Sequence, residues 1–355
     1  MSGLGLRRRL ALDIFAGLHD KTIAAHELRT LFWECTLRCN LSCRHCGSDC
    51  KAVAGVKDMP AADFLRVVDS ITPHVDTHRV MVVITGGEPL MRRDLEQVGR
   101  ALYDREYPWG VVTNGMLLDE RRLDSLQRAG IHAVTVSLDG FRESHNYMRR
   151  NERSFDNALR GIRLLSRADE LIFDVVTCAN RDNLDALGEF KEMLIGEGVK
   201  SWRIFSVFPV GRGADDPCLQ LDGGEFRRLM EFIAATRREG RIHVCYGCEG
   251  FLGRYEGEVR DSFYSCNAGV STAGIRIDGS ISGCTSIRAD FDQGNIYSDD
   301  FMTVWNERYV SYRDSEWMRR GECADCKMFR YCCGNGMHLR DGEGNLLVCH
   351  YKKTL

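Results

Sequence analysis

The sequence contains no long apolar run, and this argues against a membrane-spanning protein. No segment of its 355 residues approaches the roughly 18 to 20 consecutive apolar residues that a membrane span needs. It also contains no extended run of charge of one sign, since 48 basic and 51 acidic residues give a net charge of −3. Because nucleic-acid-binding faces are built from clustered basic residues, we expect no nucleic-acid partner.

The first 20 residues lack the cleavage site of a secretory signal peptide. They superficially resemble one, because Arg7-Arg8-Arg9 precede an apolar stretch, but Asp13 interrupts that stretch and no small-residue site follows. We therefore expect a mature cytoplasmic chain. Four apolar residues have the spacing of an amphipathic helix: Leu10, Ile14, Phe15 and Leu18.

Cysteine, in contrast, is abundant. The chain has 16 cysteines, and in the reducing cytosol such a number favours metal ligation over disulfides. The length exceeds what one hydrophobic core usually supports, so a large α/β domain with a smaller second domain is expected.

Between residues 30 and 210, short apolar runs alternate with helical patterns. This alternation predicts a parallel sheet, open or curled into a partial barrel, with ligands bound at the carboxyl ends of its strands. The candidate strands are 29–35, 79–85, 110–113, 133–138, 172–177 and 202–208. Helices are expected near 61–71, 92–105, 119–129, 154–167, 183–197 and, after a loop, 224–240. A further helix is expected at 300–320, with Trp305, Tyr309 and Trp317 packed in the core.

Three cysteines, Cys39, Cys43 and Cys46, follow the first strand at C-x3-C-x2-C spacing. A cluster of four irons ordinarily takes four thiolates, so three on one loop would leave one iron without a protein ligand. A zinc site or a set of buried thiols is the alternative.

Further polar and glycine-rich segments end the next strands. Gly86-Gly87-Glu88-Pro89 ends the second strand, and its glycines would let the backbone approach a ligand closely. Thr113-Asn114-Gly115 ends the third, where an ordinary turn is the alternative. Ser137-Leu138-Asp139-Gly140 ends the fourth, where Asp139 could instead cap a helix.

The cysteine loop, with His45 before its third cysteine, and the GGEP segment about 40 residues later resemble the radical S-adenosylmethionine (SAM) superfamily. The resemblance implies a [4Fe–4S] cluster whose open iron chelates SAM, and reductive cleavage of SAM to a 5′-deoxyadenosyl radical that takes hydrogen from a substrate. It also implies that Glu88 binds the SAM amino group and that Arg149, rather than Arg150, pairs with the SAM carboxylate, although an exposed loop arginine is the alternative. The cofactor contacts it implies are His45, Gly86, Gly87, Glu88, Pro89, Asn114, Ser137 and Arg149.

The C-terminal part carries nine of the cysteines. The alternating pattern of residues 274–283 around Asp278-Gly279 predicts a hairpin that brings Cys266 and Cys284 together. Four others have a spacing that suits zinc as well as iron: Cys323, Cys326, Cys332 and Cys349. Cysteines outside these sets are expected to be core or surface thiols: Cys35, Cys50, Cys178 and Cys218.

This arrangement resembles the SPASM auxiliary domain of radical SAM enzymes that modify peptides and proteins. The resemblance implies one or two auxiliary iron–sulfur clusters, the second held by Cys323, Cys326, Cys332 and Cys349 and the first by Cys248, Cys266 and Cys284. The family's seventh cysteine would fall at Gly336 and is absent. Three possibilities stay open: Cys333 substitutes, Cys245 joins, or one iron is left without a protein ligand.

One position argues against a particular activity of this family. Thr285 follows Cys284, where sulfatase-maturing relatives carry an aspartate that acts as a base. Formylglycine formation is therefore not expected, and no catalytic acid or base can be assigned.

The expected fold is a partial (β/α)6 TIM-like barrel with a small cysteine-rich α+β domain. We expect a helical extension at 1–28, the barrel at 29–213, a bridging helix at 214–240 and the auxiliary domain at 241–355. The resemblance implies a radical SAM oxidoreductase or maturase that acts on a peptide or small protein and takes electrons from a donor such as flavodoxin or ferredoxin. The alternatives are a radical SAM dehydrogenase of a small molecule and a non-catalytic metal scaffold.

Overall fold

The structure is a computed structural model that describes residues 4–247 and 249–355. Cys248, one of the expected ligands, lies outside the described residues. Ten strands form one sheet in the order β10-β9-β8-β1-β2-β3-β4-β5-β6-β7. The strands are β1 Thr30–Thr36, β2 Met81–Gly86, β3 Trp109–Thr113, β4 Ala133–Ser137, β5 Ile172–Ala179, β6 Ser201–Ser206, β7 His243–Tyr246, β8 Thr272–Ile275, β9 Ser280–Ser282 and β10 Gly294–Asn295.

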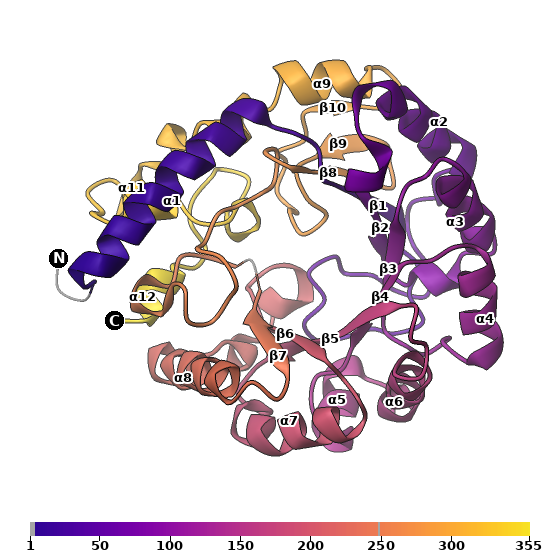
Figure 1. Cartoon of the computed structure of the whole chain (residues 1–355), viewed down its shortest axis with the longest axis horizontal. Helices are drawn as coiled ribbons and strands as arrows, with labels where there is room; N and C mark the ends of the chain where they lie inside the picture. Colours follow the sequence, from indigo (N-terminus) through magenta and orange to yellow (C-terminus); the bar gives the residue numbers. More distant parts are fainter. Residues whose placement is uncertain (1–3, 248) are drawn as a thin grey trace.

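The strands β1 to β7 are all parallel and curl into a partial barrel (Figure 1). The six strands expected from the sequence are present, each with ends within two residues of the prediction. Their alternation of apolar and polar residues places one set of side chains in the core, as in β4, where Val134 and Val136 are buried. The predicted fold class is therefore confirmed.

Helices cover the outside of the curled sheet (Figure 1). Those near the expected positions are α2 Ala61–Ile71, α3 Leu95–Asp104, α4 Glu120–Arg128, α6 Ser154–Leu165, α7 Leu187–Gly196 and α8 Gly223–Glu239, and α5 Arg142–Arg149 is additional. In α8, Asp222 and Glu225 form a reciprocal capping box and Gly240 ends the helix in the left-handed conformation.

The cysteine-rich part is joined to the barrel by the sheet itself. β7 pairs with β6, and β8 pairs in parallel with β1, from Thr30 opposite Thr272 to Trp33 opposite Ile275. β8 and β9 form the predicted hairpin around Asp278-Gly279. Cys266 and Cys284, which lie on either side of this hairpin, are thereby placed relative to the strand that leads into the Cys39 loop.

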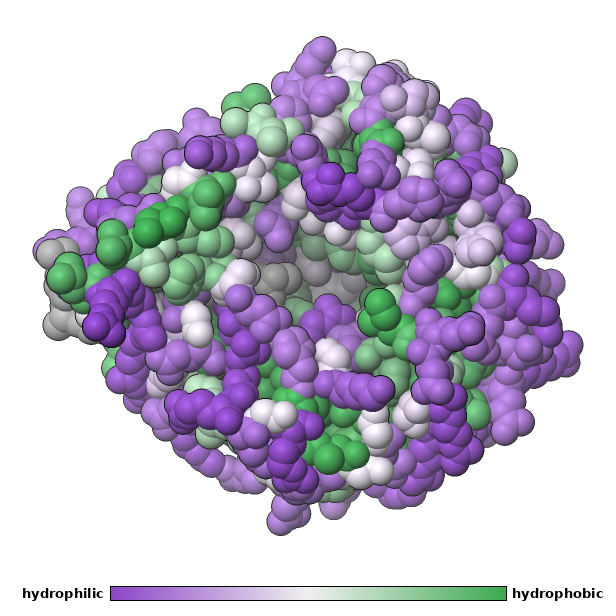
Figure 2. Space-filling view, viewed as in Figure 1, coloured by the Kyte–Doolittle hydropathy of each residue, from purple (hydrophilic) through white to green (hydrophobic). Residues whose placement is uncertain are grey.

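The N-terminal helix α1 (Leu6–Ala25) is present, but the apolar face predicted for it is wrong. Leu10, Ile14 and Leu18 are more than half exposed, whereas Leu12 is buried. Phe15 packs edge-on against Phe263, with ring centroids 5.5 Å apart. The reason is that α1 lies against the cysteine-rich part, and its exposed leucines form an apolar band on the surface (Figures 1 and 2).

A second correction concerns residues 300–320, which were expected to form one helix. The structure divides them into α9 Phe301–Glu307, α10 Val310–Arg313 and a short 3₁₀ turn at Glu316–Met318. Trp305 and Tyr309 are buried, as predicted for core residues. The last helices are α11 Phe329–Cys332 and α12 His350–Lys353. Among the described residues, no helix has the length and apolar character to cross a membrane.

The strand β1 is also anchored by an aromatic stack. The rings of Trp33 and Phe64 lie parallel with centroids 4.2 Å apart, and neither side chain is exposed. This contact fixes α2 against the strand that leads into the Cys39 loop.

We expect Trp33→Ala to lower the free energy of unfolding by about 3–5 kcal/mol, because it removes this stack and leaves a cavity. The measurement is anaerobic urea denaturation followed by circular dichroism. Ile172→Ala, at a strongly exposed position of β5, is the control and should change stability by no more than about 0.5 kcal/mol. Equal effects of the two substitutions would contradict the assigned role of Trp33.

Candidate functional site

The carboxyl ends of the barrel strands surround an open cavity. The three cysteines of the first loop meet here with residues from the ends of β2, β3 and β4. Six of the eight predicted cofactor contacts line it: His45, Gly86, Gly87, Asn114, Ser137 and Arg149. Glu88 and Pro89 are not among the lining residues, whereas Thr85 and Arg212 line the cavity without having been expected there. Cys50, which was expected to be a core or surface thiol, lines it as well.

Arg212 fastens the cysteine loop. Its Nε donates to the carbonyl of Cys43 (2.7 Å), its Nη1 donates to Asp49 (2.6 Å), and its backbone N–H donates to the carbonyl of Cys46 (3.0 Å). Gly211 precedes it with φ +56°, and a Cβ there would lie 2.6 Å from the Cys46 carbonyl oxygen. Gly211 and Arg212 are recognisable in the sequence as a turn after β6, but only the fold shows that Arg212 holds the cysteine loop.

The two glycines at the end of β2 make a backbone contact that the sequence did not reveal. A Cβ on Gly86 or Gly87 would lie 2.2 Å from the backbone oxygen of Thr36 or Arg38, respectively. The N–H of Gly87 donates to the Thr36 carbonyl (2.6 Å) and that of Glu88 to the Arg38 carbonyl (2.9 Å). The glycines therefore let β2 approach the chain that leaves β1, and this holds the Cys39 loop over the strand ends.

The carboxylate of Glu88 is fully buried and joins two strand ends. It accepts hydrogen bonds from the Thr113 hydroxyl (2.7 Å), the Asn114 N–H (2.8 Å) and the Leu90 N–H (3.1 Å). Burial raises the pKa of this carboxyl, and the three donors oppose that rise. In this structure its hydrogen bonds thus go to the protein, and it positions Asn114, whose amide Nδ2 lies 3.7 Å from the Cys39 sulfur.

Arg149 contacts the cysteine loop from the opposite side. Its Nη1 lies 3.7 Å from the Cys43 sulfur, and its Nε donates to Asp139 (2.7 Å). Burial alone would raise the pKa of the Asp139 carboxyl, but Arg149 and then His45 outweigh it and hold the pKa well below its usual range. Asp139 is therefore an anchor for Arg149, and it does not accept a hydrogen bond as a helix cap.

The lining suits an anionic cluster and a ligand with a carboxylate. Within the described residues, Arg212 Nη2 and His45 Nδ1 are buried without a hydrogen-bond partner, although both residues line the cavity. Burial also lowers the pKa of His45 to about 4, so its ring is neutral near pH 7. Burial raises the pKa of the Cys39 thiol to about 12, and a metal would have to displace that proton.

Four of the C-terminal cysteines meet in a second, mostly apolar cavity. Cys323, Cys326, Cys332 and Cys349 all line it, together with Phe329 and Leu346. Lys352 and Glu322, which form an ion pair (2.5 Å), line it as well. The structure thus brings together the whole set that the sequence grouped by spacing.

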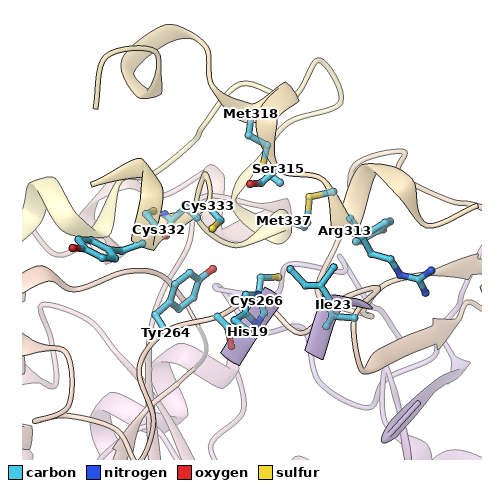
Figure 3. Close-up of a pocket in the computed structure, with 15 residues that line it drawn as sticks. His19, Ile23, Tyr264, Cys266, Arg313, Ser315, Met318, Cys332, Cys333 and Met337 are labelled. Carbon is cyan, nitrogen blue, oxygen red and sulfur yellow. The ribbon is translucent and has the colours of Figure 1, made fainter. Parts of the chain in front are cut away.

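A third cavity is lined by Cys266 and by Cys332 and Cys333 (Figure 3). The half-buried Cys284 lies close enough to Cys266 for their charges to interact. Cys333 follows α11 in the left-handed conformation, with φ +48°. Cys245 does not line this cavity; on β7 its sulfur lies 3.4 Å from Asp261 and 3.7 Å from His243 Nε2.

Comparison with known proteins agrees with this arrangement. The model of the radical SAM superfamily matches residues 33–194, and that of the SPASM iron–sulfur cluster-binding domain matches residues 266–327. The chain is 25% identical over 324 residues to AdoMet-dependent heme synthase of Methanosarcina barkeri, covering 86% of this chain and 90% of that protein. It is 29% identical over 318 residues to mycofactocin maturase MftC of Mycolicibacterium smegmatis, covering 86% and 77%.

Solved structures share the fold at lower identity. Streptococcus suis SuiB bound to S-adenosylmethionine matches with a TM-score of 0.69 and 17% identity, over 90% of this chain and 76% of that one. AnSMEcpe with bound AdoMet and the Cp18Cys peptide matches with a TM-score of 0.70 and 18% identity, over 92% and 94%.

We expect Asp139→Asn to destabilise the protein by about 3–5 kcal/mol, because it leaves the buried guanidinium of Arg149 without a counter-charge. Asp156→Asn is the matched control, since Asp156 pairs with Arg142 on the surface and exposed pairs contribute little. Anaerobic thermal denaturation of both variants measures the difference. If the two lost equal stability, Asp139 would not be the anchor described above.

Proposed function

The chain carries a radical SAM domain followed by a SPASM domain and is an enzyme, and from this premise we propose that it modifies a side chain of a peptide or small protein. Its cofactors are a [4Fe–4S] cluster, SAM and auxiliary iron–sulfur clusters. The interpretation as a non-catalytic metal scaffold is therefore wrong, since the named relatives are enzymes.

In this proposal Cys39, Cys43 and Cys46 hold the cluster that cleaves SAM, which supplies a 5′-deoxyadenosyl radical able to take hydrogen from the substrate. The observation that carries it is the convergence of these three thiols with the ends of β2, β3 and β4 around one cavity. Asn114 and Arg149 each place an N–H near one cysteine sulfur, and such hydrogen bonds stabilise a negatively charged cluster.

Other residues that line the cavity orient SAM. Arg212 Nη2, buried without a partner among the described residues, offers a hydrogen bond to an anionic group in the cavity. The guanidinium of Arg149 retains a second amino group for the SAM carboxylate while Asp139 holds its Nε. Ser137 and Thr85 place hydroxyls at the same rim.

A peptide substrate is supported by the relatives that match most of the chain. Mycofactocin maturase is one of them, and the structures that share the fold include SuiB bound to the precursor peptide SuiA. The face drawn in Figure 2 is hollowed at its centre, which leaves an approach for an extended chain. We propose a cytoplasmic enzyme that receives its electron from a donor such as flavodoxin or ferredoxin.

A small-molecule substrate is the second candidate. It is favoured by the AdoMet-dependent heme synthases among the relatives, which are 23–25% identical to this chain over 86–91% of its length. This candidate requires the same cavity and the same cysteines and differs only in what enters it.

We expect the Cys39→Ala, Cys43→Ala, Cys46→Ala triple variant to form no 5′-deoxyadenosine and to carry about four fewer irons per chain. The measurement is anaerobic: the reconstituted protein is reduced with dithionite, SAM is added and 5′-deoxyadenosine is quantified. Cys218→Ala, at an exposed cysteine, is the control and should match the wild type. Cleavage by the triple variant would refute the assignment of this loop.

The substrate class is tested by supplying small peptides encoded beside this gene, or a porphyrin, to the reduced enzyme with SAM. We expect a peptide to lose hydrogen, seen as a lower mass, and to raise the yield of 5′-deoxyadenosine above that of the enzyme with SAM alone. A porphyrin changed in mass under the same conditions, with every peptide unchanged, would replace the first candidate by the second.

A further inference from the structure

The inward face of α1 carries one polar residue in an otherwise apolar stripe. Leu12, Phe15, His19 and Ile23 recur at helical spacing, and Leu12 and Phe15 pack against the cysteine-rich part. His19 and Ile23 continue this stripe into the third cavity. The exposed face of the helix carries Leu10 and Leu18 instead, so the helix turns its imidazole inward and leaves leucines in solvent.

The cavity that His19 enters is the one that contains Cys266. Both residues line it, and in Figure 3 they lie on the same side of the pocket, with Cys332 and Cys333 beyond them. Cys284 lies within electrostatic range of Cys266, on the other end of the β8–β9 hairpin. An imidazole from the first helix thus shares a cavity with thiols that lie more than two hundred residues later in the chain.

His19 has no hydrogen-bonding role of its own in this part of the molecule. Among residues 4–247 and 249–355, no hydrogen bond or ion pair of its ring is found, and its ring contact is a stack on Phe15 with centroids 6.3 Å apart. A half-buried imidazole beside thiols is well suited to bind a metal, because neutral histidine is a common ligand of iron and zinc.

We propose that His19 is a ligand of the auxiliary cluster held by Cys266 and Cys284, where it takes the place of a missing thiolate. Gly336 stands where a further cysteine was expected, so the cysteine set of this cluster is one short. A nitrogen ligand supplies one position of the set without another thiol. It also removes one negative charge from the cluster's surroundings, which raises its reduction potential, as histidine ligation does elsewhere.

Cys333 is the competing ligand in the same cavity. It sits on the far side of the pocket, in a left-handed conformation, and its thiol faces Ser315, whose hydroxyl hydrogen-bonds to it. The imidazole of His19, in contrast, has no hydrogen-bond partner within the described residues and lies on the side of the pocket that holds Cys266. The geometry therefore favours His19.

The test is pulsed electron paramagnetic resonance of the reduced holoenzyme without SAM, prepared with natural and with ¹⁵N-labelled histidine. We expect a hyperfine coupling from a directly bound histidine nitrogen, shifted by the label. SAM is omitted because its amino nitrogen would add a coupling at the other cluster. His19→Cys should keep the iron content and lose the coupling, and His19→Ala should lose the coupling together with about four irons per chain.

Two further variants make the outcome decisive. His78→Ala, at an exposed histidine, should leave the coupling and the iron content unchanged. Cys333→Ala should also leave both unchanged. The proposal is overturned if the wild type shows no histidine coupling, if the coupling survives in His19→Ala, or if Cys333→Ala alone removes the cluster.

This inference holds for either substrate class, since it concerns only the ligands of one cluster. A failure to modify peptides would leave the nitrogen coupling in place, and a missing coupling would leave SAM cleavage in place. The two proposals therefore fail separately. Because His19→Cys restores a thiolate, it also distinguishes ligation from packing: a residue needed only to hold α1 would not change the spectrum of a cluster that keeps its iron.

Discussion

β1 is hydrogen-bonded along both edges, to β2 on one side and to β8 on the other, and the positions of two of the cysteine sets depend on this pairing. The carboxyl end of β1 leads into the Cys39 loop. The edge shared with β8 places the hairpin that carries Cys266 and Cys284 in a fixed register to that loop. Electron transfer between clusters depends on such fixed separations, and here they are set by main-chain hydrogen bonds.

Around the first cysteine loop, each buried charged group forms hydrogen bonds with other groups of the protein. Asp139 holds Arg149, Glu88 holds the Asn114 turn, and Arg212 holds the carbonyls of the loop itself. Each of these groups would be costly alone in the interior, because an unpaired buried charge is strongly destabilising. Together they define the loop's shape before any cofactor is present, so little conformational entropy is lost when one binds.

The sequence predicted those features that depend on local pattern. The six barrel strands follow from apolar runs, and the cysteine loops from their spacing. It failed where a contact joins distant segments. Gly86 and Gly87 line the cavity, but nothing in the sequence indicated their close approach to Thr36 and Arg38. The face of α1 was wrong because periodicity alone could not show that Leu12, and not Leu10, meets Phe251 and Tyr264. The assignment of Glu88 to SAM stays a prediction, and the three hydrogen bonds that its carboxylate accepts could not be foreseen, because their donors are residues whose placement only the fold reveals.

The parallel pairing of β8 with β1 limits where the chain can be divided. A barrel cut off before β8 would present the edge of its first strand to solvent, and unpaired strand edges promote association between chains. The cysteine-rich part is therefore not a removable module appended to a finished barrel. It covers the edge of β1 in the sheet. A chain that gained or lost this part in evolution would need another segment to cover the same edge.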